Sequence, residues 1–122
     1  MEDVSSKPTP LAAINTPQNN DRRGVPRYSF IASAEETELD SGARISARVS
    51  DLSLKGCYLD TLNPFPKGTQ IRVVVFHGDA TFTALATVIY PQPHMGMGIE
   101  FSAVEPDQLQ VLQKWLEELS AK

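Results

Sequence analysis

The stretch Ile71–Tyr90, IRVVVFHGDATFTALATVIY, does most to decide the fold. Its first half is rich in β-branched residues. Its second half alternates, and one face of it carries Phe82, Ala84, Ala86, Val88 and Tyr90. A period of two is typical of a strand with one buried face. His77-Gly78-Asp79 separates the halves, and its glycine suits the positive φ of a tight hairpin. The stretch therefore predicts two paired antiparallel strands.

Shorter runs on either side bring the expected count to about six strands. RISARVSD, residues 44–51, places Ile45, Ala47 and Val49 on one face. Further strands are predicted at Tyr28–Ala34, Cys57–Leu59 and Gly98–Phe101. Gly, Pro, Asn and Asp at residues 40–42 and 63–68 supply the turns between them.

The last residues change period and predict an amphipathic C-terminal helix. In EPDQLQVLQKWLEELSAK, residues 105–122, leucines recur at spacings of three and four. Pro106 and Asp107 suit a first helical turn. A mainly β fold follows: a six-stranded antiparallel barrel, closed or nearly closed, with the helix over an opening or an edge.

The length of 122 residues fits one domain. Residues 1–20 are rich in Pro, Ser and Asn and are expected to form a flexible N-terminal tail, with the domain at 21–122. A short helix at Leu11–Ile14, the one apolar patch of the tail, is the alternative.

Composition excludes several classes of protein. The net charge of −4 argues against non-specific binding of long nucleic acids, although a local cluster of basic side chains can still bind a small anion. Cys57 is the only cysteine, so an internal disulfide or a thiolate metal cluster is excluded and a cytoplasmic location is expected. MEDVSSKPTP does not resemble a secretory signal, and the apolar run Val73–Phe76 is too short for membrane insertion.

Catalytic chemistry has little support in the sequence. His77 and His94 are far apart in the sequence and do not show the spacing of metal ligands. Cys57 is expected to be a small core residue. MGMG, residues 95–98, lacks the third glycine of a dinucleotide fingerprint. We therefore expect no enzyme, no metal and no cofactor.

Two polar motifs remain, one on each side of a predicted strand pair: Arg22, Arg23 and Arg27 before the first strand, and Asp51, Ser53 and Gly56 after the second. Alone, the first is commonly a solvated linker and the second a capped turn. In an antiparallel pair, however, the start of one strand lies beside the end of the next. We therefore expect the two motifs to meet at one rim of the barrel.

The two motifs together suit a ligand that is anionic and carries guanine. Guanidinium groups pair bidentately with phosphate and with the O6/N7 edge of guanine. The Asp51 carboxylate can accept from guanine N1–H and N2, and Ser53 can donate or accept nearby. Gly56 allows a base or a phosphate to approach the backbone closely.

The order RxxxR, strand pair, DxSxxG resembles the PilZ domain, a bacterial receptor family for the second messenger cyclic di-GMP. The resemblance covers residues 21 to 119 and includes GMGIEF followed by a helix, which is similar to the last strand and C-terminal helix of that family. It implies a six-stranded antiparallel barrel, in agreement with the strand count.

By resemblance, Arg23 and Arg27 would contact guanine edges and phosphates, and Asp51, Ser53 and Gly56 would hold the other side of a guanine. Arg22 stands where an arginine accompanies an intercalated dimer of cyclic di-GMP in this family. Two positions depart from the family pattern. Cys57 replaces a frequent second glycine, and Pro26 stiffens the chain before Arg27.

The favoured hypothesis is a ligand-gated receptor that signals to a downstream protein partner, with a ligand-dependent homodimer as one route. The alternative is a PilZ-type adaptor that binds proteins without ligand. A barrel that binds single-stranded nucleic acid is a third hypothesis, and it would need exposed aromatic side chains. Phe76, Phe82 and Tyr90 fall in core patterns, which disfavours it.

Overall fold

The computed structural model describes residues 25–121. The predicted tail at 1–20, its alternative helix at Leu11–Ile14, and the arginines Arg22 and Arg23 lie outside the described residues.

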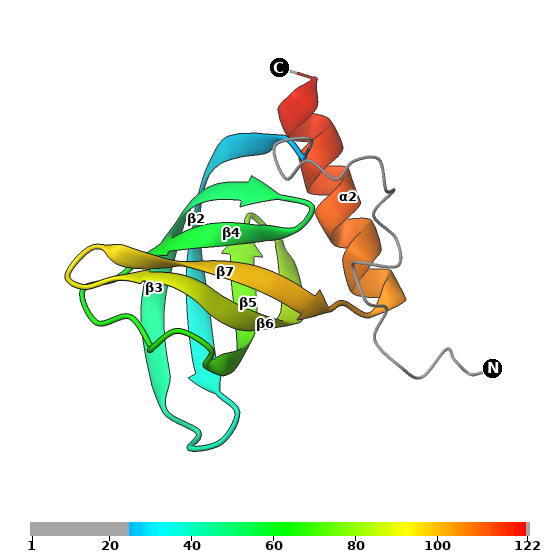
Figure 1. Cartoon of the computed structure of the whole chain (residues 1–122). Coiled ribbons are helices and arrows are strands. Elements are labelled where there is room, and N and C mark those ends of the chain that lie inside the picture. The colour runs from blue at the N-terminus through cyan, green and yellow to red at the C-terminus, as the bar shows by residue number, and fades with distance from the viewer. Residues whose placement is uncertain (1–24, 122) are drawn as a thin grey trace.

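Six antiparallel strands close into a barrel in the order β2-β3-β4-β7-β6-β5 (Figure 1). The strands are β2 (Arg27–Glu38), β3 (Arg44–Ser53), β4 (Gly56–Asp60), β5 (Gln70–His77), β6 (Ala80–Gln92) and β7 (Gly96–Ala103). The helix α2 (Pro106–Ser120) follows them. The predicted fold, a mainly β six-stranded antiparallel barrel with a C-terminal helix, is confirmed.

The hairpin that the sequence stretch predicted joins β5 to β6. Its register runs from Gln70 opposite Thr87 to His77 opposite Ala80. Gly78, the first of the two turn residues, has a φ of 61°, which a side chain with a Cβ rarely adopts. The turn therefore fixes the register of the two strands.

Inward-facing side chains fill the barrel, so it is a packed core without a lumen. Most of these side chains are apolar and are fully or almost fully buried. The core includes Phe30, Val49, Leu52, Leu59, Ile71, Val73, Val75, Phe82, Val88, Met97 and Ile99. The predicted inward face of β3 is confirmed, since Val49 is buried and Ile45 and Ala47 pack against the core.

Strand β6 departs from its predicted alternation near its end. Phe82 and Val88 are buried as expected, but Tyr90 is 58% exposed. The pairing of β6 with β7 shifts register between Val88 and Tyr90, and such a bulge turns the following side chain outward. The predicted core position of Tyr90 is therefore wrong. So is that of Phe76, which is 38% exposed near the end of β5.

Helix α2 lies against the barrel beside β6 and the start of β2 (Figure 1). Pro106 and Asp107 occupy its first turn as predicted. Its buried residues are Leu112 and Trp115, and the Trp115 ring packs 5.4 Å from Phe30 and 6.3 Å from Phe82. Trp115 thus joins the helix to the barrel core.

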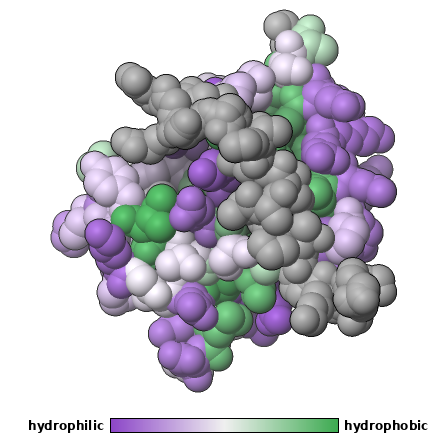
Figure 2. Space-filling model, turned by 45° about the vertical axis from the view of Figure 1, so that its right-hand side comes forward, coloured by the Kyte–Doolittle hydropathy of each residue, from purple (hydrophilic) through white to green (hydrophobic). Residues whose placement is uncertain are grey.

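The opposite side of α2 faces solvent. Figure 2 shows hydrophilic and apolar side chains interspersed on the part of this face that is coloured by hydropathy. Within residues 25–121, the structure contains no helix of the length and apolarity needed to cross a membrane.

One polar side chain, Glu36 of β2, points into the core. It is 0% exposed, and its cross-strand neighbours are Ile45 and Val73. Neither carboxyl oxygen has a hydrogen-bond partner among the described residues. Burial, helped by the negative charge of Glu35, raises the pKa of Glu36 from 4.5 to about 8. The carboxyl is therefore mainly protonated at neutral pH.

Candidate ligand-binding site

The start of β2 lies beside the end of β3. In the register of this pair, Arg27 is opposite Ser53 and Ser29 is opposite Asp51. The structure therefore brings Arg27 next to the residues of the DxSxxG motif, as the antiparallel pairing predicted. Arg22 and Arg23 precede this point, outside the described residues.

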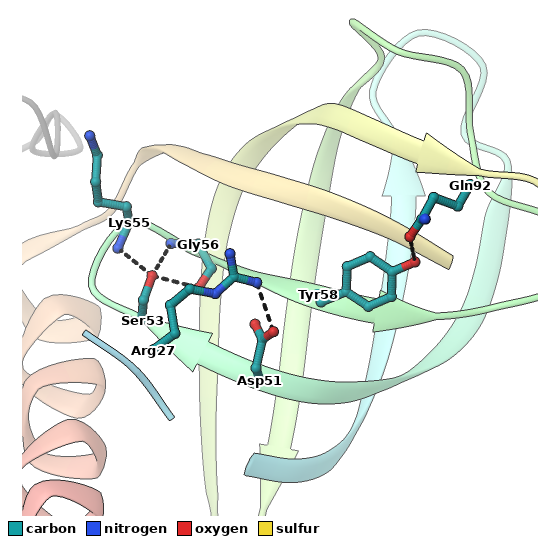
Figure 3. Close-up of polar contacts among 7 residues, drawn as sticks. All are labelled: Arg27, Asp51, Ser53, Lys55, Gly56, Tyr58 and Gln92. Atoms are coloured by element: carbon teal, nitrogen blue, oxygen red, sulfur yellow. Dashed lines mark hydrogen bonds and ion pairs between the residues drawn. The ribbon is translucent and has the colours of Figure 1, made fainter. Parts of the chain in front are cut away.

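Arg27 and Asp51 form an ion pair at this rim (Figure 3). The Nη2 atom of Arg27 donates to Oδ2 of Asp51 at 2.7 Å, and the two side chains are 63% and 27% exposed. The other oxygen, Oδ1, is buried and lacks a hydrogen-bond partner within the described part of the chain. An unpaired buried acceptor costs free energy, so a donor that reaches Oδ1 would be bound favourably.

Ser53 holds the turn that joins β3 to β4. Its Oγ accepts from the backbone N–H of Lys55 at 3.1 Å and of Gly56 at 3.2 Å (Figure 3). The hydroxyl also donates to the carbonyl oxygen of Gly56 at 3.2 Å. Because Ser53 is buried and its hydrogen is used within the turn, its contribution is to fix the shape of that turn.

Gly56 begins β4 and lies directly against β7. A Cβ at this position would collide with the carbonyl oxygen of Ile99. The sequence interpretation was that Gly56 lets a ligand come close to the backbone, whereas the close neighbour in the structure is the β7 backbone. Gly56 therefore lets β4 and β7 pair beside the turn, and so helps to form one wall of the site.

A hollow of about 380 Å³ opens next to this turn. This volume is in the range of small-molecule sites. The lining includes Arg27, Ser53, Lys55 and Gly56, together with the aromatic side chains of Tyr58 and Tyr90. Asp51 does not line the hollow, but its ion pair with Arg27 ties it to the lining. The arrangement places a cation and an aromatic wall around one cavity.

The sequence interpretation missed the aromatic wall. The Tyr58 hydroxyl donates to Oε1 of Gln92, as Figure 3 shows, and Nε2 of Gln92 donates to the Tyr90 hydroxyl at 3.3 Å. The motif MGMG contained a signal for this wall, because a Cβ on Gly96 would clash with the carbonyl oxygen of Leu59 and, at 2.7 Å, with the Tyr58 ring. Gly96 therefore leaves room both for the β4 backbone and for the Tyr58 ring over β7.

Titration of the neighbouring groups is shaped mainly by burial. Burial, followed by the charge of Asp60, raises the pKa of the Tyr58 hydroxyl, so this group keeps its proton at neutral pH. Burial also raises the pKa of the Cys57 thiol, which keeps it protonated and a poor nucleophile. Cys57 is a buried core residue, as expected.

The two histidines do not contribute to the hollow. His77 packs 4.7 Å from Phe30 and 5.4 Å from Trp115, and His94 lies in the turn between β6 and β7 with a φ of 67°. Among residues 25–121, no group of three His, Cys, Asp or Glu side chains is placed to hold a metal ion.

Solved structures with a similar fold belong to bacterial proteins. The PilZ domain of YcgR from Escherichia coli, solved with cyclic di-GMP, has a TM-score of 0.68 and 20% identity, and the match covers 83% of this chain and 93% of that one. The structure of YcgR in complex with cyclic di-GMP gives a TM-score of 0.67 at 22% identity, over 83% of this chain and 47% of that one.

The inhibitor of motility MotI (DgrA) from Bacillus subtilis has a TM-score of 0.67 at 15% identity, over 87% of this chain and 56% of that one. The chain thus spans about half the length of the longer neighbours. At these identities the likeness shows a shared fold. A search of curated protein sequences found no match.

The decisive comparison is with family models. The model of the PilZ domain matches residues 21–118, a range that contains both polar motifs and all six strands. The chain therefore belongs to the PilZ domain family.

Proposed function

We propose that this protein is a receptor for cyclic di-GMP that passes the signal to a protein partner. The observation that carries the proposal is the Arg27–Asp51 pair beside the hollow, in a chain of the PilZ family. The solved complexes of YcgR with cyclic di-GMP support the same ligand class.

The pair suits both chemical features of this ligand. The Arg27 guanidinium binds a phosphate or the O6/N7 edge of guanine, and Asp51 accepts from N1–H and N2. Arg27 occupies Oδ2 of Asp51, and Oδ1 is buried. A guanine therefore reaches the carboxylate after Arg27 turns toward the ligand, so that binding exchanges one ion pair for several ligand contacts.

Arg22 and Arg23 complete the proposed site. Arg23 supplies a second guanidinium for the phosphates. Arg22 favours an intercalated dimer of cyclic di-GMP, so the expected stoichiometry is two nucleotides per chain. Ser53 and Gly56 act by holding the turn and the β4–β7 contact that frame the hollow.

Nucleotide binding to the proposed receptor changes the surface of the protein. A downstream protein partner reads this surface, or two chains dimerise through bound nucleotide. The proposal assigns a binding protein that is not an enzyme and is located in the cytoplasm. The Cys57 thiol of the lining is kept protonated by burial, which raises its pKa, and the Ser53 hydroxyl is hydrogen-bonded within its turn, which supports a binding role. A ligand-independent adaptor is the second candidate, and partner binding that ignores the nucleotide would favour it.

Titration calorimetry with cyclic di-GMP tests the proposal directly. Loss of one bidentate arginine should cost about 1–3 kcal/mol, so Arg23→Ala and Arg27→Ala should each weaken binding about 5- to 150-fold. Unchanged affinity in both variants would overturn the assignment.

Arg48 offers a matched control. It forms a similar ion pair with Asp60 at 3.3 Å, its side chain is 64% exposed, and it does not line the hollow. Arg48→Ala should therefore leave the affinity and the stoichiometry unchanged. Thermal melting of all three variants would verify that the barrel is intact.

A further inference from the structure

The hydrogen bonds along the aromatic wall run in one direction. Tyr58 donates its hydroxyl proton to Oε1 of Gln92, and Nε2 of Gln92 donates to the hydroxyl oxygen of Tyr90. The two ends of a glutamine amide are not equivalent, because the oxygen only accepts and the nitrogen only donates. The orientation of Gln92 therefore sets the role of each tyrosine.

Within the described part of the chain, Tyr90 accepts in this network and its own proton has no acceptor. The residue is 58% exposed and lines the hollow beside Arg27. We propose that Tyr90 is a specificity-determining residue that presents its hydroxyl proton to a hydrogen-bond acceptor on the bound nucleotide. This inference rests on the proposed function and adds a contact outside the two polar motifs.

The donor role is maintained by the two residues behind Tyr90. The Tyr58 ring fits over Gly96, and its hydroxyl stays protonated at neutral pH because burial raises its pKa. Tyr58 can therefore donate to Gln92, which leaves the amide nitrogen of Gln92 toward Tyr90. Tyr58 and Gln92 are positioning residues, since they act through Tyr90.

A donor at this point selects among ligands. Guanine O6 is an acceptor, whereas adenine carries the N6 donor at the same position, so a donor directed at O6 favours guanine. N7 and the phosphate oxygens are acceptors in guanine and adenine nucleotides alike. Asp51, in contrast, accepts and so selects the N1–H and N2 edge. Tyr90 and Asp51 therefore favour complementary groups, and guanine carries both.

The test uses two substitutions, and each makes the Tyr90 hydroxyl proton unavailable to the ligand in a different way. Tyr90→Phe removes the hydroxyl, whereas Gln92→Glu places an acceptor beside it, so that Tyr90 donates to the carboxylate and turns away from the ligand. Loss of one neutral hydrogen bond is expected to weaken cyclic di-GMP binding about 3- to 10-fold in each variant. Calorimetry gives the affinities, and thermal melting reports the fold.

The double variant separates this effect from repulsion between a new carboxylate and an anionic ligand. If Gln92→Glu acts through the Tyr90 proton, adding it to Tyr90→Phe should weaken binding no further. A second loss of similar size in the double variant would overturn the inference, as would wild-type affinity in either single variant.

Two further measurements show which of the two proposals has failed and which atom of the nucleotide accepts the hydrogen bond from Tyr90. If wild-type protein shows no binding of cyclic di-GMP, the proposed function and this inference fail together, whereas normal binding with an inert Tyr90→Phe overturns the inference alone. A cyclic dinucleotide with 2-aminopurine bases lacks O6. If Tyr90→Phe no longer weakens its binding, the acceptor is O6 and the specificity role is supported. If Tyr90→Phe weakens its binding as before, the acceptor is N7 or a phosphate oxygen, which adenine nucleotides also carry, and the specificity role is overturned.

Discussion

Two carboxyl groups on neighbouring strands, Asp51 of β3 and Glu36 of β2, have opposite surroundings. Asp51 lies at the rim, with 27% of its side chain exposed and the Arg27 guanidinium 2.7 Å away. Glu36 lies inside the barrel, 0% exposed, with apolar neighbours and no hydrogen-bond partner among the described residues.

The difference shows how one barrel handles negative charge in two ways. A carboxylate beside a cation and water can exchange one partner for another. A carboxyl without partners in an apolar core is neutral at neutral pH, because ionising it there costs several kcal/mol. Asp51 therefore suits the binding role proposed above, whereas Glu36 is expected to act on stability.

The largest expected effect comes from Glu36→Leu. Burial raises the pKa of Glu36 from 4.5 to about 8, so between these pH values the folded protein keeps a proton that the unfolded chain has released. The stabilising contribution of the protonated carboxyl is complete below pH 4.5 and is lost as the pH rises to 8. One pKa unit is about 1.4 kcal/mol, so the total loss is on the order of 5 kcal/mol.

Urea denaturation at pH 5 and pH 8 measures this effect as a difference between two proteins. Wild type should lose stability relative to Glu36→Leu as the pH rises. Glu35→Gln, which changes the exposed neighbour, should retain most of the wild-type pH dependence. Equal pH dependence in wild type and Glu36→Leu would mean that Glu36 is not neutral in the folded protein.

The next effect concerns ligand binding and Asp51. Asp51→Ala removes the acceptor for guanine N1–H and N2, and a hydrogen bond to a charged group contributes about 1.5–3 kcal/mol. Calorimetry should therefore show cyclic di-GMP affinity reduced about 10- to 150-fold. Asp60→Ala is the matched control, because it breaks the Arg48–Asp60 pair and leaves the hollow unchanged. Equal losses in both variants would argue against a specific role of Asp51.

The smallest effect is that of Arg27→Ala on stability in buffer without nucleotide. Exposed ion pairs contribute less than about 1 kcal/mol, and 63% of the Arg27 side chain is exposed. The melting temperature should therefore change by only a few degrees, although ligand binding is strongly weakened. A loss of stability comparable to that of a core substitution would show that the pair has a structural role.

The barrel and the Arg27–Asp51 side of the site could be predicted because both depend on local patterns. The period of two in β6, the Gly78 turn and the spacing of the helix leucines are visible in short windows of sequence. The meeting of Arg27 with Asp51 follows from a single antiparallel pairing, so it required only that two consecutive strands form a hairpin.

The missed features depend on contacts between distant segments. Tyr90 turns outward because of a bulge opposite β7, and a period of two cannot show where a register shifts. Tyr58 and Gln92 are 34 residues apart, so their hydrogen bond is invisible to motif spacing. The first strand was expected to end at Ala34, but its pairing with β5 carries it on through Glu36 to Glu38.

The closure of the barrel by its first strand also has a consequence for folding. Strand β2 pairs with β3, its neighbour in sequence, and with β5, more than thirty residues further on. Contacts between distant segments form slowly because a long loop must close first. The hollow draws on β2, β3, β4, β6 and β7, so it forms only when these strands have assembled into the sheet. For the proposed receptor, we therefore expect no nucleotide binding by a partly synthesised chain, so that binding of cyclic di-GMP would report complete folding.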